Sequence, residues 1–242
     1  MQKKKGKLLQ GRELLLDILF PRRCPVCDRI VRFRKEYLCP DCRDTIKYVE
    51  DPTCMKCGKA LREETEYCRD CAGKRHWYRQ GAAVFEYGSV APALYRFKYG
   101  GRQEYADFFG KEMAARLGRQ MVSWKPDALI PVPVHTSRKR RRGYNQAELL
   151  AAVVSREMGI PLRTDLVKRM RKTLPQKNLN SIQRQNNLKK AFKIQKNDVK
   201  LSTIIIIDDI YTTGSTVDAL AAVLLASGVK EVYYAALAIG SG

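Results

Sequence analysis

The stretch "IIIIDDIYTTGST", residues 204–216, decides the fold of this chain. Its four consecutive isoleucines predict a strand that is buried on both faces, like the strands of a parallel sheet covered by helices. The apolar run stops at Asp208 and Asp209, so we expect the strand to end at a polar site. The loop that follows carries several hydroxyl groups and Gly214, which allows a backbone to approach a ligand closely.

Strand and helix patterns alternate around this stretch. Strands are expected at 81–87, 126–134, 201–208 and 231–239, and helices at 105–117, 143–159 and 215–228. Such a succession predicts an α/β fold, in which a parallel sheet has helices on both faces. Ligands of these folds bind at the carboxyl ends of the strands, which places the two aspartates at the binding edge.

The loop after the aspartates has the chemistry of a phosphate site. It leads into a helix whose first N–H groups lack a partner within the helix and whose dipole favours an anion. The paired carboxylates suit vicinal sugar hydroxyls, and the sequence lacks the GK[ST] ending of a nucleotide-triphosphate loop. The loop residues are Thr212, Thr213, Gly214, Ser215 and Thr216. In the alternative interpretation Ser215 or Thr216 simply caps the helix, and the aspartates are polar residues at a strand end.

All eight cysteines lie between residues 24 and 71, in four CxxC pairs. A CxxC turn presents two thiolates, and a second pair at hairpin distance completes a tetrahedral zinc site with no open position for water. We therefore expect two structural zinc ions in tandem ribbons. One zinc is assigned to Cys24, Cys27, Cys39 and Cys42, and the other to Cys54, Cys57, Cys68 and Cys71. Two alternatives stay open: interleaved ligation, in which the first and third pairs share a metal, and a disulfide framework.

The formal net charge is +21, and it is unevenly spread. Residues 138–200 contain 18 basic and 4 acidic residues, a net of +14, whereas residues 204–242 contain 1 basic and 4 acidic residues. A basic excess favours a polyanionic partner, because each neutralised phosphate releases counterions. Tyr99, Tyr144 or Phe192 is available to stack on nucleic-acid bases. The alternative is an ordinary solvated surface.

The N-terminal segment predicts an amphipathic helix rather than a signal peptide, since Arg12, Glu13 and Asp17 interrupt its apolar part. No stretch of the sequence approaches the ~18 uninterrupted apolar residues of a membrane span. The expected location is therefore the cytoplasm, and association of the amphipathic helix with an acidic membrane surface stays open. The expected parts are the helix at 1–23, the double zinc ribbon at 24–75 and the α/β domain at 76–242.

The opening stretch resembles the phosphoribosyl pyrophosphate motif of type I phosphoribosyltransferases. The resemblance implies that Asp208 and Asp209 contact the ribose hydroxyls and that the loop at 212–216 binds the 5′-phosphate. It also implies a Mg²⁺ ion that bridges ribose and pyrophosphate oxygens. The fold class that it implies is a phosphoribosyltransferase-like parallel sheet joined to a small N-terminal zinc-ribbon module.

Longer motifs resemble one branch of that family, the ComF proteins, which are the late competence proteins (ComFC) and their relatives. These motifs are "LLLDILFPRRCPVC", "YRFKYGG", "PVPVHTSRKRRRGYNQAELLA" and "LPQKNLNSIQRQNNLKKAF". The resemblance implies a cytoplasmic component of natural transformation that handles incoming single-stranded DNA alongside a helicase-like ATPase. Association with a membrane through this DNA-uptake machinery stays open. The residues of these motifs and their borders that we expect to contact anions or DNA are Lys98, Arg102, Arg138, Arg142, Asn145, Gln146 and Arg184. The alternatives are an active phosphoribosyltransferase that uses a nitrogen nucleophile, and a sensor that binds the ligand without turnover.

Overall fold

The computed structural model describes residues 21–31, 36–170, 191–195 and 200–240. Most of the helix expected at 1–23 lies outside the described residues, as does the contact expected at Arg184; residues 21–23 are described and are not helical. The chain forms two compact units that divide between Ile46 and Lys47. The second cysteine tetrad therefore groups with the α/β part, although the sequence places that boundary at residue 75.

The described part of the first unit contains a bridged turn and one short helix. Arg23 pairs with Ile30 in an antiparallel bridge that closes the turn around the first CxxC pair. Helix α2, Pro40–Arg43, follows Cys39 and carries Cys42 on its buried side. A turn and the start of a helix thus present the two cysteine pairs of the first ribbon.

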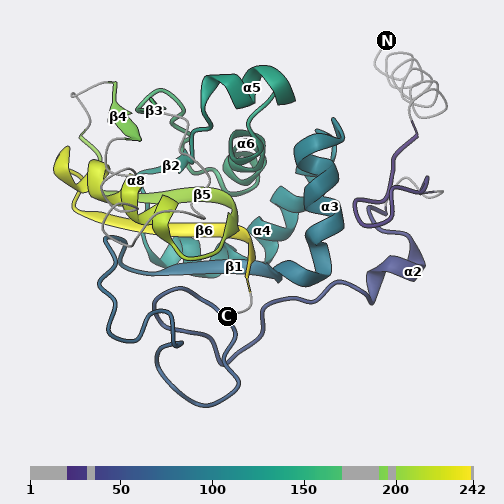
Figure 1. Ribbon diagram of the computed structural model, residues 1–242, viewed down its shortest axis with the longest axis horizontal. Coiled ribbons are helices and arrows are strands. Elements are labelled where there is room, and N and C mark those ends of the chain that lie inside the picture. The colour runs from purple at the N-terminus through teal and green to yellow at the C-terminus, as the bar shows by residue number, and fades with distance from the viewer. Residues whose placement is uncertain (1–20, 32–35, 171–190, 196–199, 241–242) are drawn as a thin grey trace, which may run out of the picture. The chain divides into compact units, whose positions relative to one another are not determined.

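A four-stranded parallel sheet forms the centre of the second unit, with the strand order β1-β6-β5-β2 (Figure 1). The strands are β1 (Gly81–Glu86), β2 (Ala128–Pro131), β5 (Thr203–Tyr211) and β6 (Glu231–Ile239). All three strand pairs are parallel, which confirms the predicted fold class. Strand β5 lies between two neighbours, so its run of isoleucines is fully buried.

Helices cover both faces of this sheet. The described helices of this unit are α3 (Tyr87–Tyr99), α4 (Tyr105–Ser123), α5 (Thr136–Arg142), α6 (Gln146–Met158) and α8 (Ser215–Ala226), of which α5 buries no residue. On one face Leu220 of α8 joins Ile204 and Ile206 in a single buried cluster. Because side chains alternate along a strand, Ile205 and Ile207 point to the opposite face. Helices α4 and α6 pack against each other and against the sheet there.

The structure differs from the sequence predictions in the length of one strand and in four further elements. Strand β5 does not end at the aspartates but continues to Tyr211, because β6 offers it hydrogen-bonding partners as far as Ile239. Helices α3 and α5 were not expected, since α3 contains Pro92 and α5 is mostly a run of cations. A small antiparallel pair, β3 (Val167–Arg169) and β4 (Phe192–Ile194), lies beside the main sheet. No helix among the described residues is both long and apolar enough to cross a bilayer.

Candidate functional site

Asp208 and Asp209 lie where β5 extends beyond its neighbour β2. The last residue of β2, Pro131, pairs with Ile207, and the Val132 N–H donates to the Ile207 carbonyl at 2.9 Å. On its other side, β5 stays paired with β6 up to Tyr211, which pairs with Ile239. The aspartates are therefore held by a neighbouring strand on one side and lie past the carboxyl end of β2 on the other, where parallel sheets bind ligands.

The two carboxylates have different environments. Asp208 is buried, and its Oδ1 accepts a hydrogen bond from the Asp209 N–H at 2.8 Å. Lys98, near the end of α3, places its Nζ 2.8 Å from Oδ2 of Asp209. Burial and the charge of Asp209 raise the pKa of Asp208 to about 8, and Lys98 opposes this shift. At neutral pH Asp208 therefore retains its proton, whereas Asp209 forms an ion pair.

A second cation, Arg169 on β3, interacts electrostatically with Asp208 and was missed by the sequence analysis. Its guanidinium is buried and lies over the ring of Phe192, 5.4 Å from the centroid. Burial and the nearby Arg138 lower the pKa of Arg169, while the charge of Asp208 raises it. No local pattern marks Arg169, because β3 is only three residues long and the contact depends on the tertiary fold.

The loop from Tyr211 to Ser215 leaves the start of α8 without a side-chain cap. Gly214 occupies the N-cap position with φ 75°, and no side chain accepts a hydrogen bond from the first turn. This differs from the alternative in which Ser215 or Thr216 caps the helix. Instead the Thr213 and Ser215 hydroxyls contact each other at 2.9 Å. The first N–H groups of α8 are thus available to an anion such as a phosphate.

We expect Gly214→Ala to destabilise the protein. The residue has φ 75°, and a Cβ there would lie 2.4 Å from the Tyr211 hydroxyl. A left-handed alanine alone costs about 1–2 kcal/mol, so the melting temperature should fall by about 5 °C. The control is Gly118→Ala in α4, whose Cβ would make only an ordinary 3.7 Å contact with Met158. Calorimetry that finds equal melting temperatures for the two variants would contradict this reading of the loop.

The other residues expected to contact anions fall into two groups. Asn145 and Gln146 are almost completely buried and already bonded. The Asn145 side chain donates to the Val132 carbonyl at 3.0 Å and caps α6, and Gln146 donates to the Phe97 carbonyl at 3.3 Å. These two residues fasten α6 to its neighbours, and a polyanion on the surface would not reach them. Arg102, which lies 3.6 Å from Glu104, remains half-exposed.

Arg142 links α5 to an exposed aromatic pair on α3. Its guanidinium lies over the Tyr99 ring, 4.7 Å from the centroid, and donates to the side-chain oxygen of Gln146 at 3.0 Å. Tyr95 and Tyr99 are 66% and 53% exposed, with their ring centroids 5.0 Å apart. Of the aromatic residues considered for base stacking, only Tyr99 is exposed.

Tyr144 and Phe192 do not suit base stacking as the sequence suggested, because both side chains are buried. The Tyr144 hydroxyl also donates to the Phe97 carbonyl. The second exposed aromatic residue is instead Tyr95, four residues before Tyr99 on the same helix. The spacing of four residues on a helix could have indicated this pair, had α3 been recognised.

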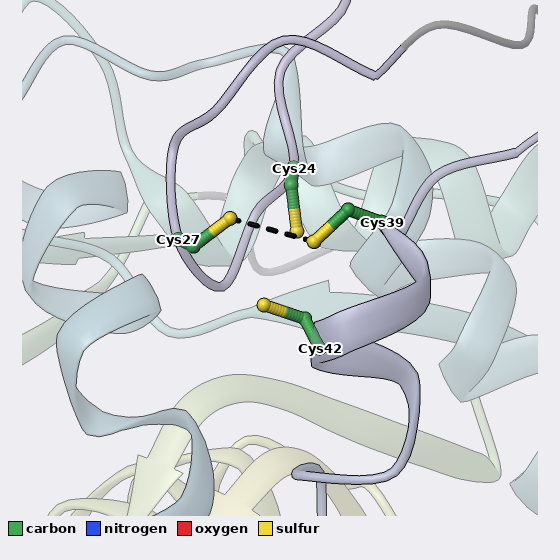
Figure 2. A group of neighbouring side chains, drawn as sticks. All are labelled: Cys24, Cys27, Cys39 and Cys42. Atoms are coloured by element: carbon green, nitrogen blue, oxygen red, sulfur yellow. Dashed lines mark hydrogen bonds between the residues drawn. The ribbon is translucent and has the colours of Figure 1, made fainter.

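The cysteines form two tetrads of consecutive CxxC pairs, and Figure 2 shows the first of them. Within each tetrad the sulfur atoms all lie within 4.8 Å of one another, and the pairs Cys27–Cys39 and Cys57–Cys68 are 3.6 Å apart. A tetrahedron with zinc–sulfur bonds of about 2.3 Å has edges of about 3.8 Å, so both tetrads fit zinc. The members are Cys24, Cys27, Cys39 and Cys42 in the first, and Cys54, Cys57, Cys68 and Cys71 in the second.

The thiols of both tetrads require a cation to ionise together. Burial raises the pKa of Cys42 and of Cys57 far above the usual value for a thiol, and neighbouring cysteines raise both further. A bound zinc ion supplies the charge that lets four thiolates share one site. With four sulfur ligands the metal has no free position, so its role is structural.

Comparisons with known proteins match both parts of the chain. A double zinc ribbon domain matches residues 15–72, and a phosphoribosyl transferase domain matches residues 110–240. The chain is 32% identical over 219 residues to Competence protein F of Haemophilus influenzae, which covers 88% of this chain and 95% of that protein. It is 30% identical over 212 residues to the DNA utilization protein YhgH of Escherichia coli, 86% of each chain. It is also 30% identical over 201 residues to Competence protein ComFC of Bacillus subtilis, 80% of each chain.

Proposed function

Since the chain belongs to the ComF family, we propose that it acts in the uptake or use of DNA, by binding single-stranded DNA beside a ribose-phosphate pocket. The names of its relatives, which include two competence proteins and a DNA utilization protein, support this role. The observation that carries the proposal is the position of α5. Its exposed cations follow the carboxyl end of β2, the same edge of the sheet on which the two aspartates lie.

Helix α5 supplies the charge for contacts with a phosphate backbone. Arg140 and Arg141 are exposed, and neither has an ion-pair partner among the described residues. Lys139 pairs with Glu148 at 2.8 Å, so this cation is partly neutralised. Cations without partners neutralise phosphates at least cost, because no existing ion pair has to break.

The tyrosine pair on α3 supplies surfaces for bases. Tyr95 and Tyr99 expose neighbouring rings, and Arg142 extends the row over Tyr99. Stacking of a base on an aromatic ring contributes about 1–3 kcal/mol and depends little on sequence, because every base has a flat face. Flat surfaces beside exposed cations suit single-stranded DNA better than duplex, whose bases are already stacked.

The pocket beside this surface suits phosphoribosyl pyrophosphate with Mg²⁺. Asp208 and Asp209 offer carboxylate oxygens to sugar hydroxyls and to a hard cation. The uncapped start of α8 offers N–H donors to the 5′-phosphate. A bound Mg²⁺ would favour the loss of the Asp208 proton, since a nearby cation stabilises a carboxylate. A helicase-like ATPase as a partner stays a prediction.

We expect Arg140→Ala/Arg141→Ala to weaken the binding of single-stranded DNA about tenfold at low salt. Two phosphate contacts fewer should also reduce the slope of log affinity against log salt concentration by about 1.4. Fluorescence anisotropy with a labelled oligonucleotide over a salt series measures both quantities. Arg119→Ala/Lys125→Ala is the control, because it removes the same charge ahead of the amino end of β2.

The tyrosine pair should behave differently from the arginines. Tyr95→Leu/Tyr99→Leu is expected to weaken binding without changing the salt slope, because it removes stacking and leaves the charges.

Binding that is absent in the native protein, or that does not depend on salt, would refute the DNA-binding proposal. Release of pyrophosphate from phosphoribosyl pyrophosphate with a nitrogen nucleophile would instead support a transferase.

A further inference from the structure

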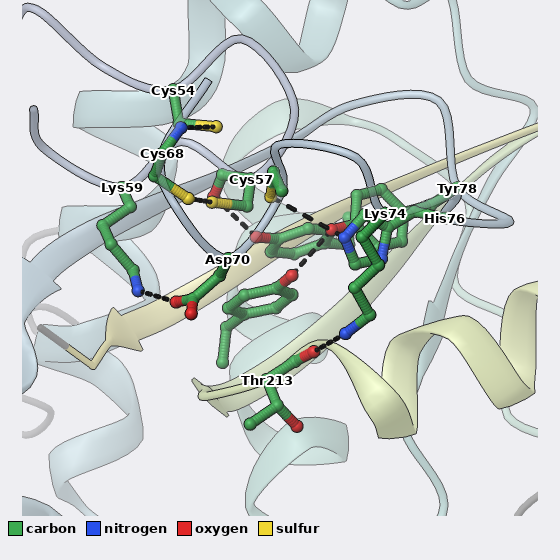
Figure 3. A network of polar contacts seen from close by, with 12 residues as sticks. Cys54, Cys57, Lys59, Cys68, Asp70, Lys74, His76, Tyr78 and Thr213 are labelled. Carbon is green, nitrogen blue, oxygen red and sulfur yellow. Dashed lines mark hydrogen bonds and ion pairs between the residues drawn. The ribbon is translucent and has the colours of Figure 1, made fainter. Parts of the chain in front are cut away.

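The segment that follows the second tetrad, residues 74–78, contacts the phosphate loop and the start of α8 (Figure 3). Lys74 donates from its Nζ to the Thr213 carbonyl at 3.1 Å. His76 places its Nδ1 2.7 Å from Oδ2 of Asp218, in the first turn of α8. We call residues 74–78 the bridging segment, because it joins the second ribbon to the loop.

The bridging segment also contacts the second tetrad directly. The His76 ring is buried, and its Nε2 lies 3.7 Å from the sulfur of Cys71. The same ring therefore contacts a metal-ligating sulfur through one nitrogen and the Asp218 carboxylate through the other. The Trp77 N–H donates to the second oxygen of that carboxylate at 2.9 Å. Such contacts fix the orientation of groups around a metal and tune the site.

A second route between ribbon and loop runs through three tyrosines. The Tyr234 hydroxyl donates to the Cys57 carbonyl at 2.6 Å, and the Tyr234 ring stacks on Tyr211, with centroids 4.7 Å apart. The hydroxyls of Tyr211 and Tyr78 lie 2.6 Å apart, which ties the bridging segment to the end of β5. Tyr211 in turn occupies the space beside Gly214 where a Cβ would lie. The position of the loop thus depends on the ribbon through packed side chains as well as through hydrogen bonds.

We propose that the second zinc ribbon holds the phosphate loop in its binding conformation, with Lys74 and His76 as positioning residues. The coupling is reciprocal: zinc in the second tetrad strengthens the binding of a phosphate monoester in the loop, and the bound phosphate strengthens the retention of that zinc. The proposal rests on the ribose-phosphate pocket proposed above. The first tetrad belongs to the other compact unit, so its zinc provides an internal comparison.

Lys74→Met tests the positioning role through affinity. We expect it to weaken the binding of ribose 5-phosphate about tenfold in calorimetry, because the Thr213 carbonyl loses a charged donor. Lys74→Arg should restore most of the affinity, since a guanidinium can donate to the same carbonyl. Arg75→Met is the matched control, as this exposed neighbour has no bond to the loop. Equal affinities for Lys74→Met and Arg75→Met would overturn the proposal.

The reciprocal effect is tested on zinc itself. In a Cys24→Ser/Cys39→Ser background, which lacks the first site, a chelator should remove the remaining zinc several-fold more slowly when ribose 5-phosphate is bound. His76→Gln breaks the contact with Cys71 but keeps an amide near Asp218, so it should abolish this protection. Zinc release that ribose 5-phosphate does not slow, in a protein that binds it, would overturn the coupling.

Hydrogen exchange separates this proposal from the pocket on which it rests. Without any ligand, Lys74→Met and His76→Gln should increase the exchange of residues 211–218 above that of Arg75→Met, because the loop opens more often. Unchanged exchange would overturn the positioning role. If the native protein fails to bind ribose 5-phosphate while exchange rises as expected, the pocket is refuted and the structural link is supported.

Discussion

Asp208→Asn/Asp209→Asn is expected to abolish the rise in melting temperature that phosphoribosyl pyrophosphate with Mg²⁺ gives the native protein. A ligand at one hundred times its dissociation constant stabilises the folded state by about 2.7 kcal/mol, or about 5–10 °C for a unit of this size. Both carboxylates contribute to that energy, through the sugar hydroxyls and through the charge that holds a magnesium ion. Thermal scans with and without ligand measure the effect.

The control for this variant is Glu63→Gln/Glu64→Gln, which removes the same charge from exposed positions of the second ribbon. It should keep the full shift. A shift that survives in the aspartate variant would place the ligand elsewhere. The unliganded melting temperature of the variant shows whether it is folded. We expect only a small fall, since Asp208→Asn replaces a group that is already uncharged at neutral pH and Asp209→Asn removes one ion pair, with Lys98.

The raised pKa of Asp208 also predicts how the free energy of unfolding depends on pH. Its pKa is about 8 in the folded protein, where burial and Asp209 disfavour ionisation, and about 3.9 in an unfolded chain. Between these values the folded state binds the extra proton, so stability falls as pH rises from about 4 to about 8. Lys98 opposes this loss, and Arg169, which interacts with the charge of Asp208, has Arg138 beside it. Asp208→Asn should therefore gain stability over the native protein progressively across that range in denaturant titrations.

Local patterns in the sequence were sufficient to predict the main elements. The run of isoleucines in β5 indicated a buried parallel strand because such strands have no solvent face, and all four residues are buried. The CxxC spacing indicated zinc sites because the ligands of each tetrad are close in sequence. The acid pair and Gly214 indicated a candidate site because their chemistry is unusual at a strand end.

Contacts between distant segments could not be predicted in the same way. His76 and Asp218 are 142 residues apart, and Lys98 reaches Asp209 only because α3 lies beside the end of β5. Asn145 matches a motif that suggests anion contacts, yet the fold uses its side chain to cap α6. A polar side chain in a motif can bind a ligand, or it can form hydrogen bonds that hold the surrounding backbone. The burial of Asn145 distinguishes these two roles.

Loss of the second zinc is expected to have the largest effect on the fold. All four cysteines of that tetrad belong to the same buried cluster as the isoleucines on one face of β5. Structural zinc contributes about 10–16 kcal/mol to the folding of small domains. If the substitution removes about a third of 10 kcal/mol from the free energy of unfolding, the melting temperature of a unit of about 200 residues falls by about 10 °C. Calorimetry of Cys57→Ser, together with a zinc count, measures this change.

Cys27→Ser in the first tetrad is the matched comparison, because it removes one thiolate from a site in the other compact unit. It should also lose one zinc, yet it should leave the main unfolding transition nearly unchanged. The difference follows from where each metal is placed: the second ribbon is packed into the core beneath β6, with the Tyr234 hydroxyl bonded to the Cys57 carbonyl. Equal falls in melting temperature for the two serine variants would contradict the assignment of the second ribbon to the fold of the α/β unit.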